Sequence, residues 1–465
     1  MKAPKGPKPH APARTRGMRE VRALGSPLNR QVLLPAERFI YSETISGALL
    51  LACAVVALLW ANSPWSQSYF ALRDIPVSFQ IGAFSVAMDL QHWINDGLMA
   101  IFFFVVALEI KRELISGDLS DKRKAALPVA AALGGMIVPA GLYLALNFGG
   151  AGALGWGIPM ATDIAFAVAI LALLGERVPS QLRIFLLTFA IADDVGSILV
   201  IAVYYTAHFS LEAMGLAIGV LGLMLAMRRL GFRSTLAYVL PAVVFWVAML
   251  KSGVHATIAG VILGAITPAK SSGRKSTFVE TMRATLPDVR DSLDREESER
   301  SEVMIGRIEE LARQTESPLE RLERMVHPWT SYLVLPLFAL VNAGVALSAE
   351  FIRQALTSSV TLGVMLGLVV GKVVGVTGFA WLSVRLGWAT MPGGVAWPHI
   401  TGAGLIGGVG FTVSLFITGL AFSDKMLIEE AKVGVLAASL IAALGGYLFL
   451  LLYCRRTQPR EVQAE

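Results

Sequence analysis

Residues 189–206 read FAIADDVGSILVIAVYYT, which places two adjacent carboxylates inside an otherwise apolar run. A bilayer-spanning helix needs about 20 mainly apolar residues, and ionisable residues within one are costly and indicate function. Asp193 and Asp194 cannot both stay ionised there without compensation, because burial and mutual repulsion favour the protonated forms. A bound cation would restore their ionisation. Protons and a cation would therefore compete for the same oxygens.

The composition of the whole chain agrees with a membrane protein. Of 465 residues, 55% are apolar and only 16% charged, and the mean hydropathy is +0.63. A soluble domain is nearer one quarter charged, so an ordinary soluble enzyme and a disordered chain are excluded. The net charge of +6 is typical of basic cytoplasmic loops in a membrane protein, so we expect no nucleic-acid partner. Cys53 and Cys454 lie far apart and predict neither a disulfide framework nor a metal cluster.

The pattern predicts an all-α polytopic membrane protein with about 12 transmembrane helices. The predicted spans are 43–63, 92–114, 124–147, 155–175, 180–205, 211–227, 235–250, 253–268, 329–347, 358–384, 399–422 and 429–453. They divide the chain into a basic tail (1–40), spans 1–8 (41–268), a charged loop (269–327), spans 9–12 (328–454) and a second tail (455–465).

Lysine and arginine are concentrated in alternate short loops, which places both termini in the cytoplasm. Between spans 1 and 2, apolar residues alternate near 75–88 around Gly82. This alternation predicts a small periplasmic β-hairpin, with a loop of chance alternation as the alternative.

Two further spans contain helix-breaking residues beside polar groups. Pro159 and two glycines precede Thr162 and Asp163 in span 4, and five glycines precede Phe411 and Thr412 in span 11. Such interruptions indicate discontinuous helices at a midplane binding site, whereas close helix packing is the alternative for the span 11 glycines. Asp163 could then offset facing helix N-termini, and Lys372 in span 10 facing C-termini.

Carboxylates and the Thr162 hydroxyl are oxygen ligands, which favour Na⁺ or Li⁺ over transition metals. The expected metal ligands are Asp194, Asp193 and Thr162. A second set of titratable residues lies at the cytoplasmic ends of spans 2 and 9. These could respond to pH near neutrality or simply anchor the helix ends at the interface, and they are Glu109, Arg112, Glu113, Glu323 and His327.

Six blocks resemble the NhaA-type bacterial sodium/proton antiporters and follow one another in that family's order. They are INDGLMAIFFFVVALEIKREL (94–114), WGIPMATDIAFAVAILALLG (156–175), FAIADDVGSILVIAVYYT (189–206), SGVHATIAGVILG (252–264), HPWTSYLVLPLFALVNAGV (327–345) and GGVGFTVSLFI (407–417). The resemblance implies inverted three-helix repeats in spans 3–5 and 10–12, with spans 4 and 11 broken and crossing.

The resemblance also assigns roles to residues. It implies that Asp194 is the principal cation ligand and that Asp193 carries a proton and pairs with Lys372. Asp163 and Thr162 would lie beside the site, and Glu109, Arg112, Glu323 and His327 would take part in pH response. A homodimer joined partly through the hairpin is implied as well, in contact with membrane lipid. Arg324 departs from the family's pattern, in which histidine is frequent at that position.

The function expected is a pH-regulated, electrogenic Na⁺(Li⁺)/H⁺ antiporter that works by alternating access. It is a secondary active transporter and not an enzyme, and it needs no cofactor beyond the transported ions. A Na⁺-coupled symporter for an organic anion would need a roomier polar cavity. An intramembrane aspartyl protease would need two separated aspartates, whereas these are adjacent. A structural or receptor protein would not need charges buried in the membrane.

Overall fold

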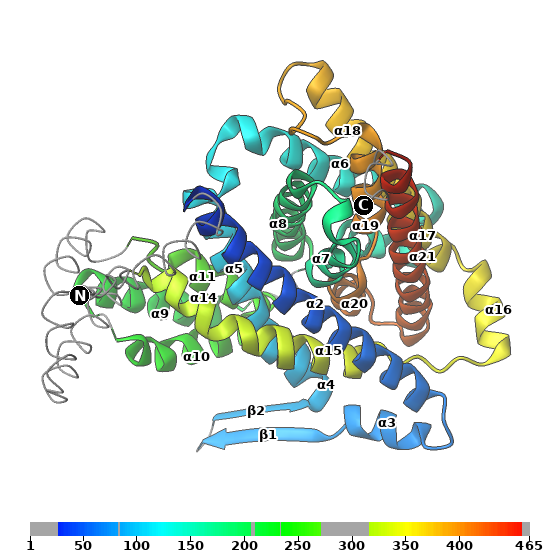
Figure 1. The fold of residues 1–465 in the computed structure, drawn as a ribbon. Coiled ribbons are helices and arrows are strands. Elements are labelled where there is room, and N and C mark those ends of the chain that lie inside the picture. The colour runs from blue at the N-terminus through cyan, green and yellow to red at the C-terminus, as the bar shows by residue number, and fades with distance from the viewer. Residues whose placement is uncertain (1–26, 82–83, 206–209, 233, 271–315, 458–465) are drawn as a thin grey trace, which may run out of the picture.

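The computed structural model describes residues 27–81, 84–205, 210–232, 234–270 and 316–457. The predictions for residues 1–26, for most of the charged loop (271–315) and for residues 458–465 lie outside these. The described chain is predominantly helical (Figure 1). Its β-structure is one two-stranded antiparallel sheet of β1 (Pro76–Ile81) and β2 (Phe84–Asp89), within the stretch where apolar residues alternate.

Six helical segments of the described residues are long and apolar enough to cross a bilayer. They are Thr44–Ala61 within α2 (Pro27–Ala61), α6 (Lys122–Asn147), α8 (Ser180–Tyr204), α9 (Leu211–Arg229), the continuous α17 to α18 (Ser359–Arg385), and α21 (Lys425–Thr457). Two bent pairs bring the number to eight if each pair is one span. The chain is therefore a multi-pass helical protein by length and composition.

Other helices occupy the remaining predicted ranges. Two series of helical segments run without a break. The first is α4 (Leu90–His92), the π-turn η1 (Trp93–Leu98) and α5 (Met99–Ser116). The second is α14 (Pro318–Trp329), the π-turn η5 (Thr330–Val334) and α15 (Leu335–Asn342). α10 (Thr235–Ser252) and α11 (Thr257–Ile266) are shorter and apolar. A count of twelve spans stays a prediction.

The helix that leads into predicted span 9 begins within the charged stretch. The Ser317 hydroxyl accepts a hydrogen bond from the backbone N–H of Glu320, and the Glu320 carboxylate accepts one from the Ser317 N–H. This capping box starts α14 at Pro318. A weak apolar stripe that includes Leu319 and Leu322 predicts a solvated or interfacial helix within the charged loop, and residues 318–327 are indeed helical.

Both bent pairs break where the sequence predicted. The 3₁₀-helix η3 (Ala151–Met160) meets α7 (Ile164–Leu173) at 45°, and α19 (Trp397–Gly407) meets α20 (Phe411–Ala421) at 47°. The glycines of the second break also permit close packing: a Cβ on Gly410 would lie 2.9 Å from the Ala161 carbonyl oxygen, and one on Gly408 would overlap the Leu368 carbonyl. Both interpretations of these glycines therefore apply.

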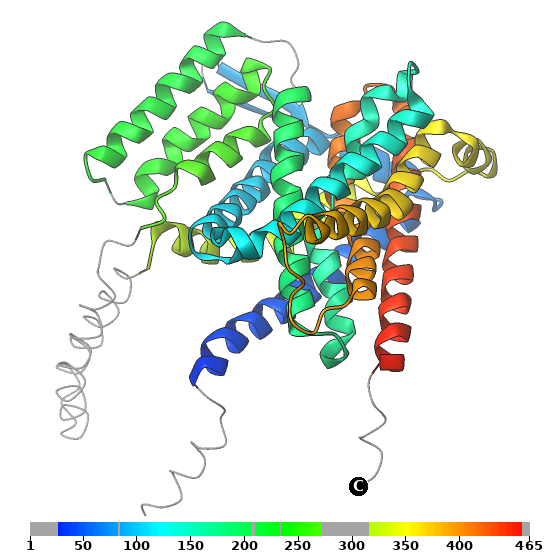
Figure 2. The same cartoon turned by 90° about the horizontal axis from the view of Figure 1, so that it is seen from above.

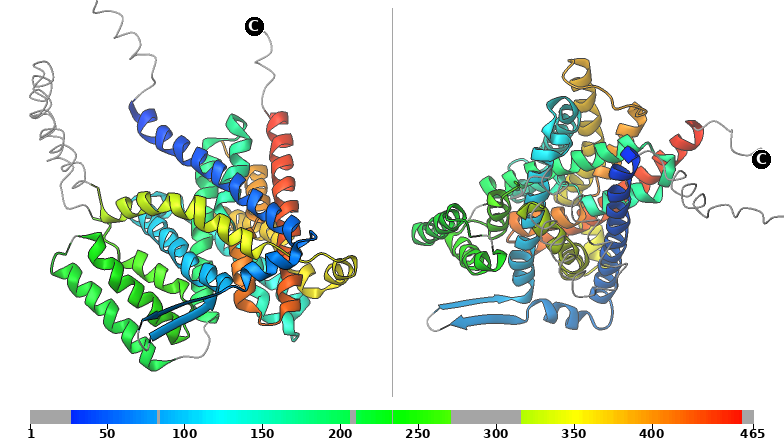
Figure 3. Two further views of the ribbon diagram at one scale, coloured as in Figure 1. Left: turned by 90° about the horizontal axis from the view of Figure 1, so that it is seen from below. Right: turned by 60° about the vertical axis from the view of Figure 1, so that its left-hand side comes forward.

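The bent pairs lie within a group formed with α6, α8, α17, α18 and α21, while α9, α10 and α11 stand together at the other side (Figures 1 and 2). α2 and α15 run side by side across the molecule, and α2 also packs on α7 (Figure 3). Tight contacts join α6 to α18, because a Cβ on Gly134 would overlap the carbonyl oxygen of Gly375. The small residues here let two backbones touch, as in membrane helix packing.

The sheet extends along one edge of the molecule (Figure 3). Its register pairs Pro76 with Asp89 and Val77 with Met88. The Trp93 indole N–H donates to the Val77 carbonyl at 3.0 Å and so ties the sheet to the start of span 2. Phe79 is 61% exposed, so the sheet presents an uncovered aromatic side chain.

Candidate ion-binding site

The two helix breaks cross and hold each other through backbone and hydroxyl hydrogen bonds. The Asp163 N–H donates to the Val409 carbonyl at 2.7 Å, and the Thr162 hydroxyl donates to the Gly407 carbonyl at 2.8 Å. The backbone is extended at Ala161 and Asp163, so the Asp163 N–H cannot form a hydrogen bond within a helix. Each break therefore supplies hydrogen-bond partners for polar groups of the other break. The crossing sets the positions of Thr162 and Asp163.

Asp163 lies at two helix N-termini at once. One carboxylate oxygen accepts from the Phe166 N–H at the start of α7, at 3.2 Å. The other accepts from the Thr412 N–H at 3.1 Å and from the Thr412 hydroxyl at 2.5 Å, at the start of α20. Helix N-termini carry partial positive charge, so this buried anion stabilises both of them.

Lys372 bridges the crossing and the carboxylate pair. Its ammonium group donates to Asp193 Oδ2 at 2.8 Å and to the Thr162 hydroxyl at 3.0 Å, and all three side chains are buried. Thr162 in turn donates to Gly407 at the C-terminal end of α19, so Lys372 reaches that negative end through Thr162. A buried ion pair of this kind is held only when further hydrogen bonds accompany it.

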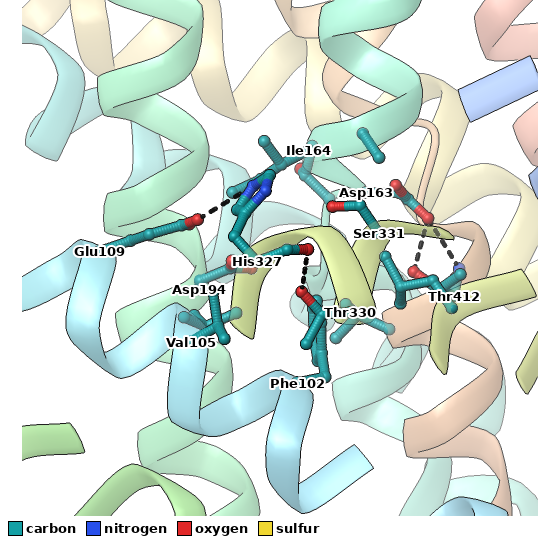
Figure 4. A pocket seen from close by; sticks show the side chains of 15 residues that line it. Phe102, Val105, Glu109, Asp163, Ile164, Asp194, His327, Thr330, Ser331 and Thr412 are labelled. Atoms are coloured by element: carbon teal, nitrogen blue, oxygen red, sulfur yellow. Dashed lines mark hydrogen bonds and ion pairs between the residues drawn. The ribbon is translucent and has the colours of Figure 1, made fainter. Parts of the chain in front are cut away.

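Asp194 faces a different environment from Asp193. It lines a cavity of about 50 Å³, together with Thr162, Asp163, Glu109 and His327 (Figure 4). One water needs about 10–15 Å³ by such a measure, so the cavity accommodates a few waters or a partly hydrated ion. The remaining lining residues are Phe102, Val105, Val106, Ile164, Ala165, Thr330, Ser331, Leu335, Thr412 and Val413.

The five predicted pH-response residues divide into a pair and a group of three. His327 Nε2 lies 3.6 Å from Glu109 Oε1 at the cavity wall (Figure 4). Arg112 forms an ion pair with Glu323 and also lies 3.7 Å from the Glu113 carboxylate. Of the five residues, the structure thus brings Glu109 and His327 to the same cavity as Asp194, whereas the other three lie outside its lining.

Some residues of the site were not singled out from the sequence. Thr412 supplies two of the hydrogen bonds to Asp163, whereas the sequence indicated only that it lies beside the glycine run, one residue after Phe411. Thr330 and Ser331 line the cavity from the π-turn η5. A π-turn shifts the helix register, and nothing in the apolar pattern around HPWTS reveals such a shift.

Comparison with known proteins shows the family of the chain. Residues 37–450 match the family described as Na⁺/H⁺ antiporter 1. The chain belongs to this family. A relative from Oleidesulfovibrio alaskensis, named Na(+)/H(+) antiporter NhaA, is 46% identical over 435 residues, which cover 93% of this chain and 96% of that protein. The protein of the same name from Rhodopirellula baltica is 46% identical over 90% of this chain and 94% of its own length.

A third relative, Na(+)/H(+) antiporter NhaA 2 from Sorangium cellulosum, is 46% identical over 90% of this chain and 89% of its own. The family match includes every residue of the site described above. As a member of the Na⁺/H⁺ antiporter 1 family, the chain is a multi-pass membrane transport protein and not an enzyme.

Proposed function

We propose that this protein exports Na⁺ or Li⁺ in exchange for protons across the bacterial inner membrane by alternating access. One observation carries the proposal: the buried Asp194 lines a small cavity that Glu109 and His327 also line, while its neighbour Asp193 is held by Lys372. This gives one carboxylate that a hydrated ion can reach and one that is charge-compensated by the protein.

Asp194 is the principal cation ligand, with Thr162 beside it, and Asp193 is the proton carrier. A bound Na⁺ stabilises the ionised carboxylates and so displaces their protons, whereas protonation removes the charge that holds the cation. If both aspartates release a proton for each Na⁺ bound, the exchange moves net charge. The membrane potential would then drive Na⁺ outward, which makes the cycle electrogenic.

Asp163 and Lys372 keep the crossing charge-balanced while the site changes access. Asp163 stabilises the N-termini of α7 and α20 through three hydrogen bonds. Lys372 stabilises Asp193 and, through Thr162, the end of α19. Movement of the crossing against α8 would therefore change access to Asp194 without exposing uncompensated helix dipoles.

pH regulation would act through the residues at the cavity mouth. Protonation of His327 or Glu109 changes the charge within the cavity that leads to Asp194, and the Arg112–Glu323 pair lies nearby. A change in this local charge alters the concentration of cations at the site. Glu113 contributes through its contact with Arg112.

The arrangement in the membrane completes the proposal. Both termini, the basic tail (1–40) and the charged loop (269–327) lie in the cytoplasm, and spans 3–5 and 10–12 form inverted repeats. The β1–β2 sheet lies in the periplasm and joins two copies of the chain in a homodimer within membrane lipid. The two similar break angles support the repeats, and the exposed Phe79 supports a contact at the sheet.

The cavity volume favours an inorganic ion over an organic anion. About 50 Å³ leaves room for a few waters, whereas a symported organic substrate would require a much larger space. The adjacent aspartates also lie in different environments, one held by Lys372 and one at the cavity, which does not suit a protease that needs two carboxylates around one water.

The test is pH-resolved fluorescence dequenching in everted membrane vesicles with Na⁺, Li⁺ and K⁺. We expect Na⁺ and Li⁺ to release protons, and Asp194→Asn to abolish this release. Asp118→Asn, at a 42% exposed side chain away from the cavity, is the matched control and should behave as the wild type. Retained Na⁺-dependent proton movement in Asp194→Asn would refute the assignment of Asp194 as the cation ligand. An exchange rate that does not change when the membrane potential is clamped would refute the electrogenic cycle.

A further inference from the structure

Ser197 places a buried hydroxyl one helical turn beyond the two aspartates of α8. The residue is 1% exposed, and within the described part of the chain its Oγ has no hydrogen-bond partner. Nearly all buried polar atoms in native proteins are paired, so an unpaired one calls for an explanation. Asp193 Oδ1 is likewise buried and makes no hydrogen bond of standard geometry to the described residues.

Another hydroxyl on the same helix shows the usual arrangement. The Thr188 Oγ1 donates to the Ile184 carbonyl one turn earlier, at 2.9 Å. Such back-bonding is the common way for a serine or threonine inside a helix to satisfy its hydroxyl. Ser197 does not do this, so its hydroxyl remains available to something else.

Ser197 is a neighbour of both carboxylates on the surface of α8. It follows Asp194 by three residues and Asp193 by four, and residues at these spacings are neighbours on a helix surface. Side chains in a helix tilt towards its N-terminus, so the Ser197 side chain leans back over the turn that carries the aspartates. Neither Asp193 nor Ser197 lines the cavity, and both side chains are buried. A position between them therefore lies outside the cavity that Asp194 lines.

We propose that the Ser197 hydroxyl is a ligand of the transported cation at a second position, next to the cavity, formed with Asp194 and the Oδ1 atom of Asp193. A small hard cation that leaves its water shell needs several oxygen ligands in place of water. Three such oxygen groups here come from a single turn of α8. The cation would move from the cavity to this position before release on the other side. The proposal rests on the proposed function and adds a ligand to it.

The experiment uses full-length protein with Ser197→Ala, Ser197→Cys and the control Thr188→Val. Alanine removes an unpaired buried hydroxyl, so the variant should fold at least as stably as the wild type. Cysteine keeps nearly the same volume but offers sulfur, a poor ligand for a hard cation. At one fixed pH we expect the half-saturating Na⁺ and Li⁺ concentrations to rise about tenfold in both Ser197 variants, a loss of roughly one charge-assisted contact.

Binding is measured separately from transport, as the rise in melting temperature that Na⁺ or Li⁺ produces in purified protein. We expect this rise to shrink in both Ser197 variants and to be unchanged in Thr188→Val, whose hydroxyl is already bonded to the backbone. If the Ser197 variants have the same half-saturating Na⁺ and Li⁺ concentrations as the wild type, and the same rise in melting temperature, the inference is wrong and the proposed function still stands. A wild-type protein without Na⁺-dependent proton release would instead overturn the proposed function.

Discussion

The ammonium group of Lys372 lies 2.8 Å from Asp193 Oδ2, and both side chains are completely buried. The pair joins α18 to α8, two helices that are far apart in sequence. Because neither charge reaches solvent, each depends on the other for its stabilisation. The neighbouring Asp194 has no such lysine bond in the described structure and faces the cavity instead, so adjacent residues occupy two different electrostatic environments.

Removal of one partner of this pair should destabilise the protein strongly. Lys372→Met leaves Asp193 as an uncompensated buried acid, and breaking such a pair costs about 3–5 kcal/mol. We expect a clearly lower melting temperature in detergent and partial recovery in the double variant with Asp193→Asn. Lys124→Met, at a 68% exposed side chain, is the control for loss of a lysine. A single variant as stable as the wild type would contradict a stabilising role for the pair.

Loss of the Asp163 carboxylate should loosen the crossing. Asp163→Ala removes three accepted hydrogen bonds at two helix N-termini, and a single cap is worth about 0.5–2 kcal/mol. Asp163→Asn keeps one acceptor and should destabilise less. Thermal unfolding should therefore rank wild type, Asn and Ala in that order. Equal melting temperatures for all three would show that these hydrogen bonds do not hold the crossing together.

A side chain at Gly410 should disrupt transport because there is no space for it. Its Cβ would lie 2.9 Å from the Ala161 carbonyl oxygen of the other broken helix. We expect Gly410→Ala to reduce exchange severely in everted vesicles. Gly410 immediately precedes α20, and Gly419 lies within that helix with no atom within 4 Å of its added Cβ. Gly419→Ala is therefore the control for replacing a nearby glycine by alanine. Comparable activity of the two variants would argue against a role for close approach at the crossing.

The contact between His327 and Glu109 predicts the direction in which the pH dependence of exchange shifts when Glu109 is replaced. The Glu109 carboxylate, 3.6 Å from the imidazole Nε2, favours the protonated form of His327. In Glu109→Gln, loss of the imidazole proton should therefore occur at lower pH. If that loss activates exchange, the pH of half-maximal activity should fall. Glu212→Gln, at the exposed start of α9, is the control, and addition of His327→Gln should remove the effect of Glu109→Gln.

Much of the fold was predictable because the membrane imposes strong rules on sequence. Apolar runs of spanning length identified the helices, and Gly155, Pro159 and the glycines of 402–410 identified both breaks. The rarity of charge inside the spans singled out Asp163, Asp193, Asp194 and Lys372 without any structure. The apolar stripe through Leu319 and Leu322 indicated a helix in the charged loop, but its start at Pro318 is set by a local cap, Ser317 with Glu320, that the stripe does not reveal.

What the sequence by itself determined is which residues carry charge in an apolar environment, because an ion buried in lipid is costly wherever it lies along the chain. What only the tertiary structure decided is how those charges are shared. From charge alone Lys372 could have paired with either aspartate; the family resemblance implied Asp193, and the packed structure has this pair and leaves Asp194 at the cavity. Adjacent residues on a helix point about 100° apart, so the packing of α18 and of the crossing against α8 selects which carboxylate is compensated.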